Sequence, residues 1–236
     1  IRDVSVSGSV SGERYVGGIV GKNNGFLTDS YTMGTVDSET DSAGGLAGWN
    51  SGKIYLSYST AAVEGERSGG IAALNSGTIA RSFSTGSVEG EKAGGITGKN
   101  SYDNEIYNDG DYFYPHREGE IMNSYSSATI DGTSSGGAIG VNNGSVKNVY
   151  ATGRIYGGEA QSGGLVGESG SAASVSSSYY DEQSTYSTFS AGGTDLLTEE
   201  MKTVSSFQGW DFNDVWSMPE DGYPQLDVNQ YKAVLS

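Results

Sequence analysis

The residues best suited to chemistry gather in one segment between Ser101 and Arg117, which also contains the single histidine of the chain. Aromatic rings stack on the C–H faces of sugars, and carboxylates accept hydrogen bonds from hydroxyl groups. The segment combines both groups, so it predicts a ligand-binding loop. The alternative is a loop whose rings are buried against the rest of the molecule. The predicted ligand-binding residues are Tyr102, Asp103, Tyr107, Tyr112, Phe113, Tyr114 and His116.

Two carboxylates of this segment, Asp109 and Asp111, flank Gly110 and offer closely spaced oxygen atoms to a Ca²⁺ ion. They lack the spacing and the terminal bidentate Glu of an EF-hand loop. A structural Ca²⁺ ion is therefore a secondary prediction, and no other cofactor is expected. His116 is a poor transition-metal ligand, because the chain has no second His and no Cys.

The segment interrupts a repeat that is marked by pairs of glycines. Successive pairs are separated by 27, 25, 25, 42 and 27 residues, and the segment lies in the longest interval. A period of this length indicates one small unit stacked on copies of itself, because each unit alone is too small to bury a core. The pairs are Gly17-Gly18, Gly44-Gly45, Gly69-Gly70, Gly94-Gly95, Gly136-Gly137 and Gly163-Gly164.

Apolar positions keep a constant distance from each pair. In the second repeat they are Leu46, Ile54 and Val63, with an aromatic residue at Tyr58. Serines alternate with the aromatic residue, as in residues 57–59, and a period of two is typical of β-strands. The pattern predicts an all-β chain: a β-solenoid of about six coils, each with three short strands, wound as a right-handed parallel β-helix. Whether the tyrosines or the serines point inward stays open.

An asparagine recurs at a turn of each repeat, and its side chain is expected to bond the neighbouring coils. The asparagines are Asn23, Asn50, Asn75, Asn100 and Asn142, and Ser169 takes their place in the last repeat.

Carboxylates also recur, one residue after the last aliphatic position of a repeat, at Asp37, Glu64, Glu89 and Asp131. A second set lies three residues after that position, at Glu13, Glu39, Glu66 and Glu91. Stacked coils would place these like charges ~5 Å apart, which is repulsive unless they are solvated, paired or bridged by cations. We expect a solvated edge with Glu–Arg or Glu–Lys partners in neighbouring coils. Bridging by calcium is the alternative.

The composition excludes several classes of protein. The 236 residues include 38 Gly but only 3 Pro, which is unlike collagen or a Pro-rich disordered chain. A net charge of −16 argues against nucleic acids and anionic membranes as partners. No Cys is present, and no apolar run is long enough to insert into a membrane. The first repeat is incomplete, which predicts a fragment of a longer protein, and we expect it to be a monomer.

The repeated phrase Gly-Gly-[Ile/Leu]-x-Gly-x-Asn-x-Gly-x-[Ile/Leu]-x-x-Ser-Tyr-[Ser/Thr]-x-Gly resembles the GLUG motif. The resemblance covers residues 4 to about 180 in six copies, with departures at Ala73, Ala138 and Val149. It implies a secreted or surface-anchored bacterial or archaeal protein, as in adhesins and in the non-catalytic regions of IgA-specific metallopeptidases. The motif itself carries no activity.

The chain divides into a solenoid over residues 1–190, with the inserted loop at 101–117, and a capping segment over 191–236. A short helix is predicted from Thr198 to Lys202, with Thr198 or Asp195 as its N-cap. A solenoid end exposes unpaired strand edges and an open core, so a cap is required. A sugar-stacking face is the alternative use of the aromatic residues, which are Phe207, Trp210, Phe212, Trp216 and Tyr223.

Catalysis is not expected, because general acid and base chemistry needs two carboxylates with different environments in one cleft. We predict a non-catalytic extracellular module of a larger surface protein. It would bind a glycan or a surface protein of a host or neighbouring cell, or act as a rigid spacer in adhesion. The alternative is a substrate-positioning domain of a secreted protease or glycan-degrading enzyme. A lower alternative is a polysaccharide-active β-helix enzyme that uses Asp29 or Asp103.

Overall fold

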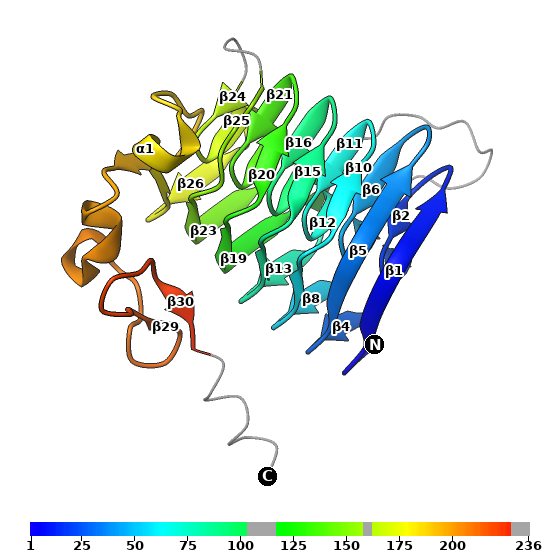
Figure 1. The fold of residues 1–236 in the computed structure, drawn as a ribbon, viewed down its shortest axis with the longest axis horizontal. Coiled ribbons are helices and arrows are strands. Elements are labelled where there is room, and N and C mark those ends of the chain that lie inside the picture. The colour runs from blue at the N-terminus through cyan, green and yellow to red at the C-terminus, as the bar shows by residue number, and fades with distance from the viewer. Residues whose placement is uncertain (103–116, 158–161, 228–236) are drawn as a thin grey trace.

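The computed structural model describes residues 1–102, 117–157 and 162–227, and it shows coils stacked along a rod with parallel pairing between coils (Figure 1). A six-stranded sheet contains one strand from each coil, which confirms the predicted all-β solenoid of six coils. Its strands are β2 (Val16–Gly17), β6 (Ser42–Gly44), β11 (Arg67–Gly69), β16 (Lys92–Gly94), β21 (Ser134–Gly136) and β24 (Ser162–Gly163).

Two further sheets complete the wall of the rod. The seven-stranded sheet consists of β3 (Val20–Asn23), β7 (Ala47–Asn50), β12 (Ala72–Asn75), β17 (Thr97–Tyr102), β18 (Arg117–Glu118), β22 (Ile139–Asn142) and β25 (Val166–Ser169). The fifteen-stranded sheet consists of β1 (Ser5–Gly12), β4 (Phe26–Thr28), β5 (Tyr31–Ser38), β8 (Lys53–Tyr55), β9 (Tyr58–Ser59), β10 (Ala62–Glu64), β13 (Thr78–Ala80), β14 (Phe83–Ser84), β15 (Ser87–Glu89), β19 (Glu120–Ser126), β20 (Thr129–Asp131), β23 (Ser145–Ala151), β26 (Ser174–Ser176), β27 (Tyr179–Asp181) and β28 (Thr194–Leu196).

A regular coil contains five short strands, as in β11 to β15, so the expectation of three strands per coil was wrong. One cause is a corner between the second aliphatic position and the aromatic position. One residue of every coil adopts a left-handed backbone there. In the regular coils it divides what the pattern predicts as one strand, whereas β19 and β23 continue through it. The corner residues are Asp29 (φ 52°), Leu56 (51°), Arg81 (49°), Asn123 (46°), Asn148 (54°) and Ser177 (44°).

The aliphatic positions fill the interior in the predicted register. Ile54 aligns with Ile79, Ile79 with Ile121, and Ile121 with Val146, and all four side chains are buried. The alignment of Ile79 with Ile121 crosses the insertion. The extra residues therefore leave the rod without shifting the coils on either side of them.

The asparagine row lies inside the rod and links the coils through its side chains. Each Nδ2 donates to the Oδ1 of the next asparagine, at 2.8 Å from Asn23 to Asn50 and at 2.9 Å from Asn100 to Asn142. The Nδ2 of Asn142 is buried without a partner, because Ser169 follows in register. The row is thus complete except at its C-terminal end.

The serines of the Ser-Tyr-Ser phrase point inward and the tyrosines point outward, which resolves the alternative that the alternation left open. Ser57 and Ser82 are buried, and the Oγ of Ser82 accepts a hydrogen bond from the amide of Ser57 at 3.3 Å. It also donates to the carbonyl oxygen of Ala80 at 2.9 Å. Each such hydroxyl thus joins two coils.

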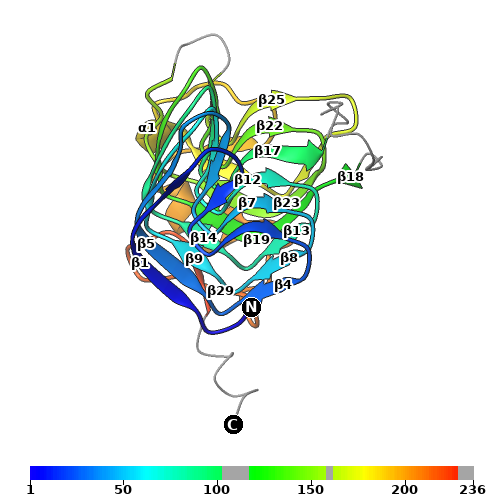
Figure 2. The same ribbon diagram turned by 90° about the vertical axis from the view of Figure 1, so that its right-hand side faces the viewer.

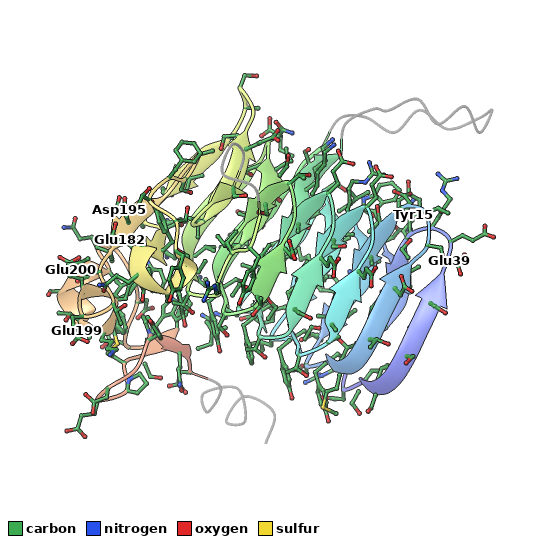
Figure 3. All side chains as sticks on the ribbon, turned by 45° about the horizontal axis from the view of Figure 1, so that its top comes forward. Tyr15, Glu39, Glu182, Asp195, Glu199 and Glu200 are labelled. Atoms are coloured by element: carbon green, nitrogen blue, oxygen red, sulfur yellow. The ribbon has the colours of Figure 1, made fainter. Side chains whose placement is uncertain are left out.

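The C-terminal end of the rod carries the predicted small cap, which has two parts, and the first part begins before the predicted boundary at residue 191. The first closes the end of the core: Tyr180 points inward into the main hydrophobic cluster, and the Oγ of Ser190 accepts from the amides of Leu165 and Val166. Burial raises the pKa of Tyr180, with Asp195 and Glu182 adding to the effect. Figure 3 shows both carboxylates at this end, with Tyr15 and Glu39 at the opposite end.

The second part of the cap packs on the side of the rod. Trp210 donates to the carbonyl oxygen of Ser177 at 2.8 Å, and Tyr223 donates to Asp181 at 2.6 Å. The segment contains the antiparallel strands β29 (Trp216–Ser217) and β30 (Gln225–Leu226) and the 3₁₀ turns η1 (Glu200–Lys202) and η2 (Val204–Ser206).

The prediction that Thr198 or Asp195 is the N-cap of this helix was wrong. Glu199 precedes η1 without a side-chain cap, and the hydroxyl of Thr198 donates instead to Asp181 at 2.8 Å. Asp195 lies in β28. Asp181 itself caps α1 (Glu182–Thr185), a helix that the sequence pattern did not indicate.

Candidate functional site

The insertion is flanked by β17 and β18, which pair in an antiparallel manner as part of the seven-stranded sheet. Ser101 of β17 pairs with Glu118 of β18, and the backbone of Tyr102 pairs with Arg117. Viewed along the rod, β17 and β18 lie on the side opposite to β5 (Figure 2). The other predicted ligand-binding residues and the two calcium candidates lie outside the described residues; they are Asp103, Tyr107, Asp109, Asp111, Tyr112, Phe113, Tyr114 and His116.

The described part of the chain offers a different surface, on the outward face of β5, β10, β15 and β20. An open groove of about 560 Å³ runs across these four strands. A row of small side chains borders it on one side, and a row of carboxylates, here called the acidic row, borders it on the other. The small side chains are Thr35, Ala62, Ser87 and Thr129, and the acidic row is Asp37, Glu64, Glu89 and Asp131.

The acidic row is in register from coil to coil and is exposed. Neighbouring coils in a sheet lie ~4.8 Å apart, so the row carries like charges at that spacing. No basic side chain of the described residues forms an ion pair with any of its four members. The expected pairing with Arg or Lys of neighbouring coils is therefore wrong for this row.

Two of the basic residues converge elsewhere. Arg67 forms a buried ion pair with Asp41, and the Nε of Arg14 lies 3.7 Å from the same carboxylate. Asp41 is only 4% exposed, so its charge needs these partners inside the protein. The two arginines stabilise a turn of the solenoid.

The groove ends at an aromatic and cationic cluster that the sequence reasoning missed. Tyr156 lines the end of the groove, and the guanidinium carbon of Arg154 lies 4.8 Å from the centre of its ring. On the other side, Arg154 lies 4.2 Å from the ring of Tyr186. A signal was present, because the fifth coil has Arg and Tyr where earlier coils have a small residue and a carboxylate.

A second outward row, here called the aromatic row, runs along the neighbouring part of the wall. Its rings stack at 4.8 to 5.0 Å with interplanar angles of 0° to 6°, so their faces are used within the row. A sugar would meet only ring edges there. The row consists of Tyr31, Tyr58, Phe83, Tyr125 and Tyr150.

The capping segment covers the C-terminal half of the aromatic row. Trp216 lies 6.0 Å from Tyr150 and 6.4 Å from Tyr125, and the hydroxyl of Tyr150 donates to the carbonyl oxygen of Pro224 at 2.6 Å. Burial raises the pKa of Tyr125 to about 12 and raises that of Tyr150 well above its usual value. This half of the row is thus a structural interface within the chain.

Asp29, the described carboxylate of the enzymatic alternative, has structural partners, and so does the buried Asp181. Asp29 is a left-handed corner residue that accepts from Thr28 at 3.0 Å and lies 3.4 Å from the Nε of Arg2. Burial disfavours the charge of Asp181, but hydrogen bonds outweigh this and lower its pKa; the first of them comes from Tyr223. Both carboxylates are engaged in holding the fold.

No three His, Cys, Asp or Glu side chains of the described residues form a group that could hold a metal ion. In the same part of the chain, no helix has the length and apolar character that a membrane crossing needs.

Comparison with known proteins gives a fold likeness and a partial sequence likeness. No family model matches the chain, so the likeness to the GLUG motif remains a resemblance. A protein of Evansella cellulosilytica named "Putative Gly-rich membrane protein" is 38% identical over 92 residues. The match covers 36% of this chain and 11% of that protein.

A solved structure shares the fold over most of the chain. It is a crystal structure of a "putative immunoglobulin A1 protease" from Bacteroides ovatus, with a TM-score of 0.65 and 21% sequence identity. The superposition covers 94% of this chain and 75% of the other. At this identity the likeness establishes the solenoid architecture and does not extend to the activity.

Proposed function

We propose that this chain is a non-catalytic module of a larger extracellular or cell-surface protein and that it acts in adhesion by binding a ligand. The observation that carries the proposal is the groove across β5, β10, β15 and β20. Its acidic row raises the energy of the fold by repulsion and has no ion pair within the described residues. A surface that costs stability and remains open is suited to a partner.

The test is an array of glycans and extracellular-matrix proteins probed with the whole chain. We expect binding by the wild type and its loss in the variant Glu64→Gln/Glu89→Gln/Asp131→Asn, here called the groove variant. The matched control is Glu39→Gln/Glu66→Gln/Glu91→Gln, which removes three exposed carboxylates outside the groove and should bind as the wild type does. Absence of binding by the wild type, or equal loss in both variants, would refute the proposal.

The inserted loop remains a second proposed contact, with a Ca²⁺ ion as its proposed structural ligand. The β17–β18 pair brings the ends of the loop together, so residues 103–116 can be replaced by a short glycine turn. The same array, run on this deletion with added calcium and with a chelator, separates the two surfaces. Binding that survives the deletion and the chelator assigns the ligand to the groove and rejects the loop.

A second candidate function is favoured by the likeness to the solved protease structure. In this candidate function, the present chain would be a non-catalytic domain that positions the substrate of a secreted protease. Immunoglobulin A1 is then the ligand to test, by surface plasmon resonance on the immobilised chain. Saturable binding that the groove variant abolishes would favour this function, and absence of binding would leave adhesion as the better proposal.

A further inference from the structure

Two outward rows of the solenoid change character at the same coil. One row is small or hydroxylic from Ser9 to Thr129 and then becomes Arg154. The row beside it is the acidic row, and after Asp131 it becomes Tyr156. The register of these positions follows from the bridge between Ile130 and Ile155. The repeat therefore ends in a cation and an aromatic ring that its own pattern does not require.

The backbone holds the cluster in place from both sides. The amide of Ile130 donates to the carbonyl oxygen of Arg154 at 2.8 Å, and the amide of Tyr156 donates back to Ile130 at 2.8 Å. The amide of Ile155 donates to Thr185, the last residue of α1, at 3.2 Å. Tyr186 follows α1 in a left-handed conformation (φ 58°), which brings its ring to Arg154. The site is thus built on hydrogen-bonded backbone.

Packing does not explain the two rings. Tyr156 is 55% exposed and Tyr186 is 69% exposed, whereas the rings of the hydrophobic clusters are mostly buried. Arg154 lies between them and forms no ion pair with a carboxylate of the described residues. No hydrogen bond or ion pair within the described residues engages its guanidinium, so the N–H groups remain available as donors.

The chemistry of this cluster favours a sugar over other ligands. An aromatic ring accepts the C–H face of a pyranose, while a guanidinium donates to its hydroxyls and a carboxylate accepts from them. Asp131 supplies that carboxylate in the position adjacent to Tyr156. An anionic sugar would meet the acidic row and a net charge of −16, which disfavours it. The combination of donor, acceptor and ring therefore fits neutral sugars.

We infer that Arg154, Tyr156 and Tyr186 form a binding subsite for a neutral sugar at the C-terminal end of the groove. The inference rests on the proposed function and names the ligand class and the residues. A chain of several sugars would extend from this subsite along the groove, with its hydroxyls on the small row and the acidic row. Sugar units would contact Asp131 first and then Glu89.

Isothermal titration calorimetry with the whole chain tests the inference. The probes are the neutral hexasaccharides of cellulose, mannan, xylan and chitin, with hexagalacturonate as the anionic probe and hexalysine as the cationic probe. We expect at least one neutral hexasaccharide to bind, and Tyr156→Ala and Tyr186→Ala each to weaken it about tenfold or more. Tyr156→Phe keeps the ring and should stay within about threefold of the wild type.

The matched control is Phe26→Ala, which removes another exposed ring that lies near a cation, Lys53, on β4 and β8. It should leave the affinity unchanged. Binding of a neutral hexasaccharide that survives Tyr156→Ala but not the groove variant would overturn this subsite while the proposed function stands. Binding of hexalysine alone, or of no probe, would overturn the assignment to neutral sugars.

Discussion

The acidic row and the aromatic row both run along the outside of the same rod, yet their physical chemistry is opposite. In the aromatic row, each ring gains contact with the next at 4.8 to 5.0 Å, so stacking identical residues stabilises the coils. In the acidic row, the same register sets like charges side by side and costs free energy. The stability of the fold is therefore a sufficient reason for the aromatic row, but it gives no reason for the acidic row.

The two rows also differ in what covers them. The capping segment packs on Tyr125 and Tyr150, whereas the acidic row remains exposed and ends at the Arg154 cluster. One row is an interface that the chain fills by itself, and the other is a surface left for a partner. Four experiments can break or sharpen this difference.

The largest effect is expected where the aromatic row is covered. Tyr150→Ala removes a ring that is 3% exposed and contacts Trp210 and Trp216, so it should lower the free energy of unfolding by about 3–5 kcal/mol. Tyr31→Ala, at the uncovered end, should cost only about 1 kcal/mol. Urea unfolding followed by tryptophan fluorescence and circular dichroism measures both, and equal losses would show that the cap adds nothing to the row.

Alkaline pH should weaken the covered half of the aromatic row next. Burial raises the pKa of Tyr125 to about 12 in the folded protein, against 10.0 for an ordinary tyrosine. The neutral form is thus favoured by folding, so its contribution is fully present below pH 10 and is lost as the pH rises towards 12. A shift of this size corresponds to about 2–3 kcal/mol.

Urea unfolding at pH 8 and at intervals up to pH 12 measures this loss. The variant Tyr125→Phe cannot ionise at this position and should lose less stability over the same interval. A pH dependence that is the same in the variant and the wild type would assign the alkaline loss to other groups.

Much of the fold could be predicted from the sequence, because aliphatic positions at constant spacing dictate which residues stack in the core. The register of Ile79 with Ile121 across the insertion follows from this spacing alone. The left-handed corners could not be predicted in the same way. Asp or Asn, which tolerate this conformation, occupy three of the six corners, but Leu56, Arg81 and Ser177 occupy the others, so no residue type marks the bend in every coil.

Only one part of the candidate site, the acidic row, could be predicted from the sequence. The acidic row follows from spacing, since it is part of the repeat. The cluster at its end needs Tyr186, which belongs to the segment after the last coil and reaches Arg154 only because Asp181 caps α1. A contact between a repeat and a non-repeating segment has no period, and periodicity therefore cannot reveal it.

The asparagine row offers a third test of stacking, because its side chains are uncharged and lie inside the rod. Ser169→Asn should give the orphaned Nδ2 of Asn142 an acceptor and raise the free energy of unfolding by about 1 kcal/mol. Ser169→Ala is the matched control, since it offers no acceptor and loses the hydrogen bond to Ala191. Thermal unfolding of the two variants decides the point: an Asn variant no more stable than the Ala variant would mean that the row gains nothing from a further member.

The smallest effect is expected in the acidic row and bears most directly on function. If repulsion is its main contribution, Glu64→Gln/Glu89→Gln should raise the free energy of unfolding by about 0.5 kcal/mol at low ionic strength. The gain should vanish in 1 M salt, where the screening length falls to ~3 Å. Glu220→Gln/Asp221→Asn removes two exposed charges from the capping segment and controls for net charge. If Glu64→Gln/Glu89→Gln gained no more than this control, the row would carry no cost, and repulsion would give no reason to assign the row to a partner.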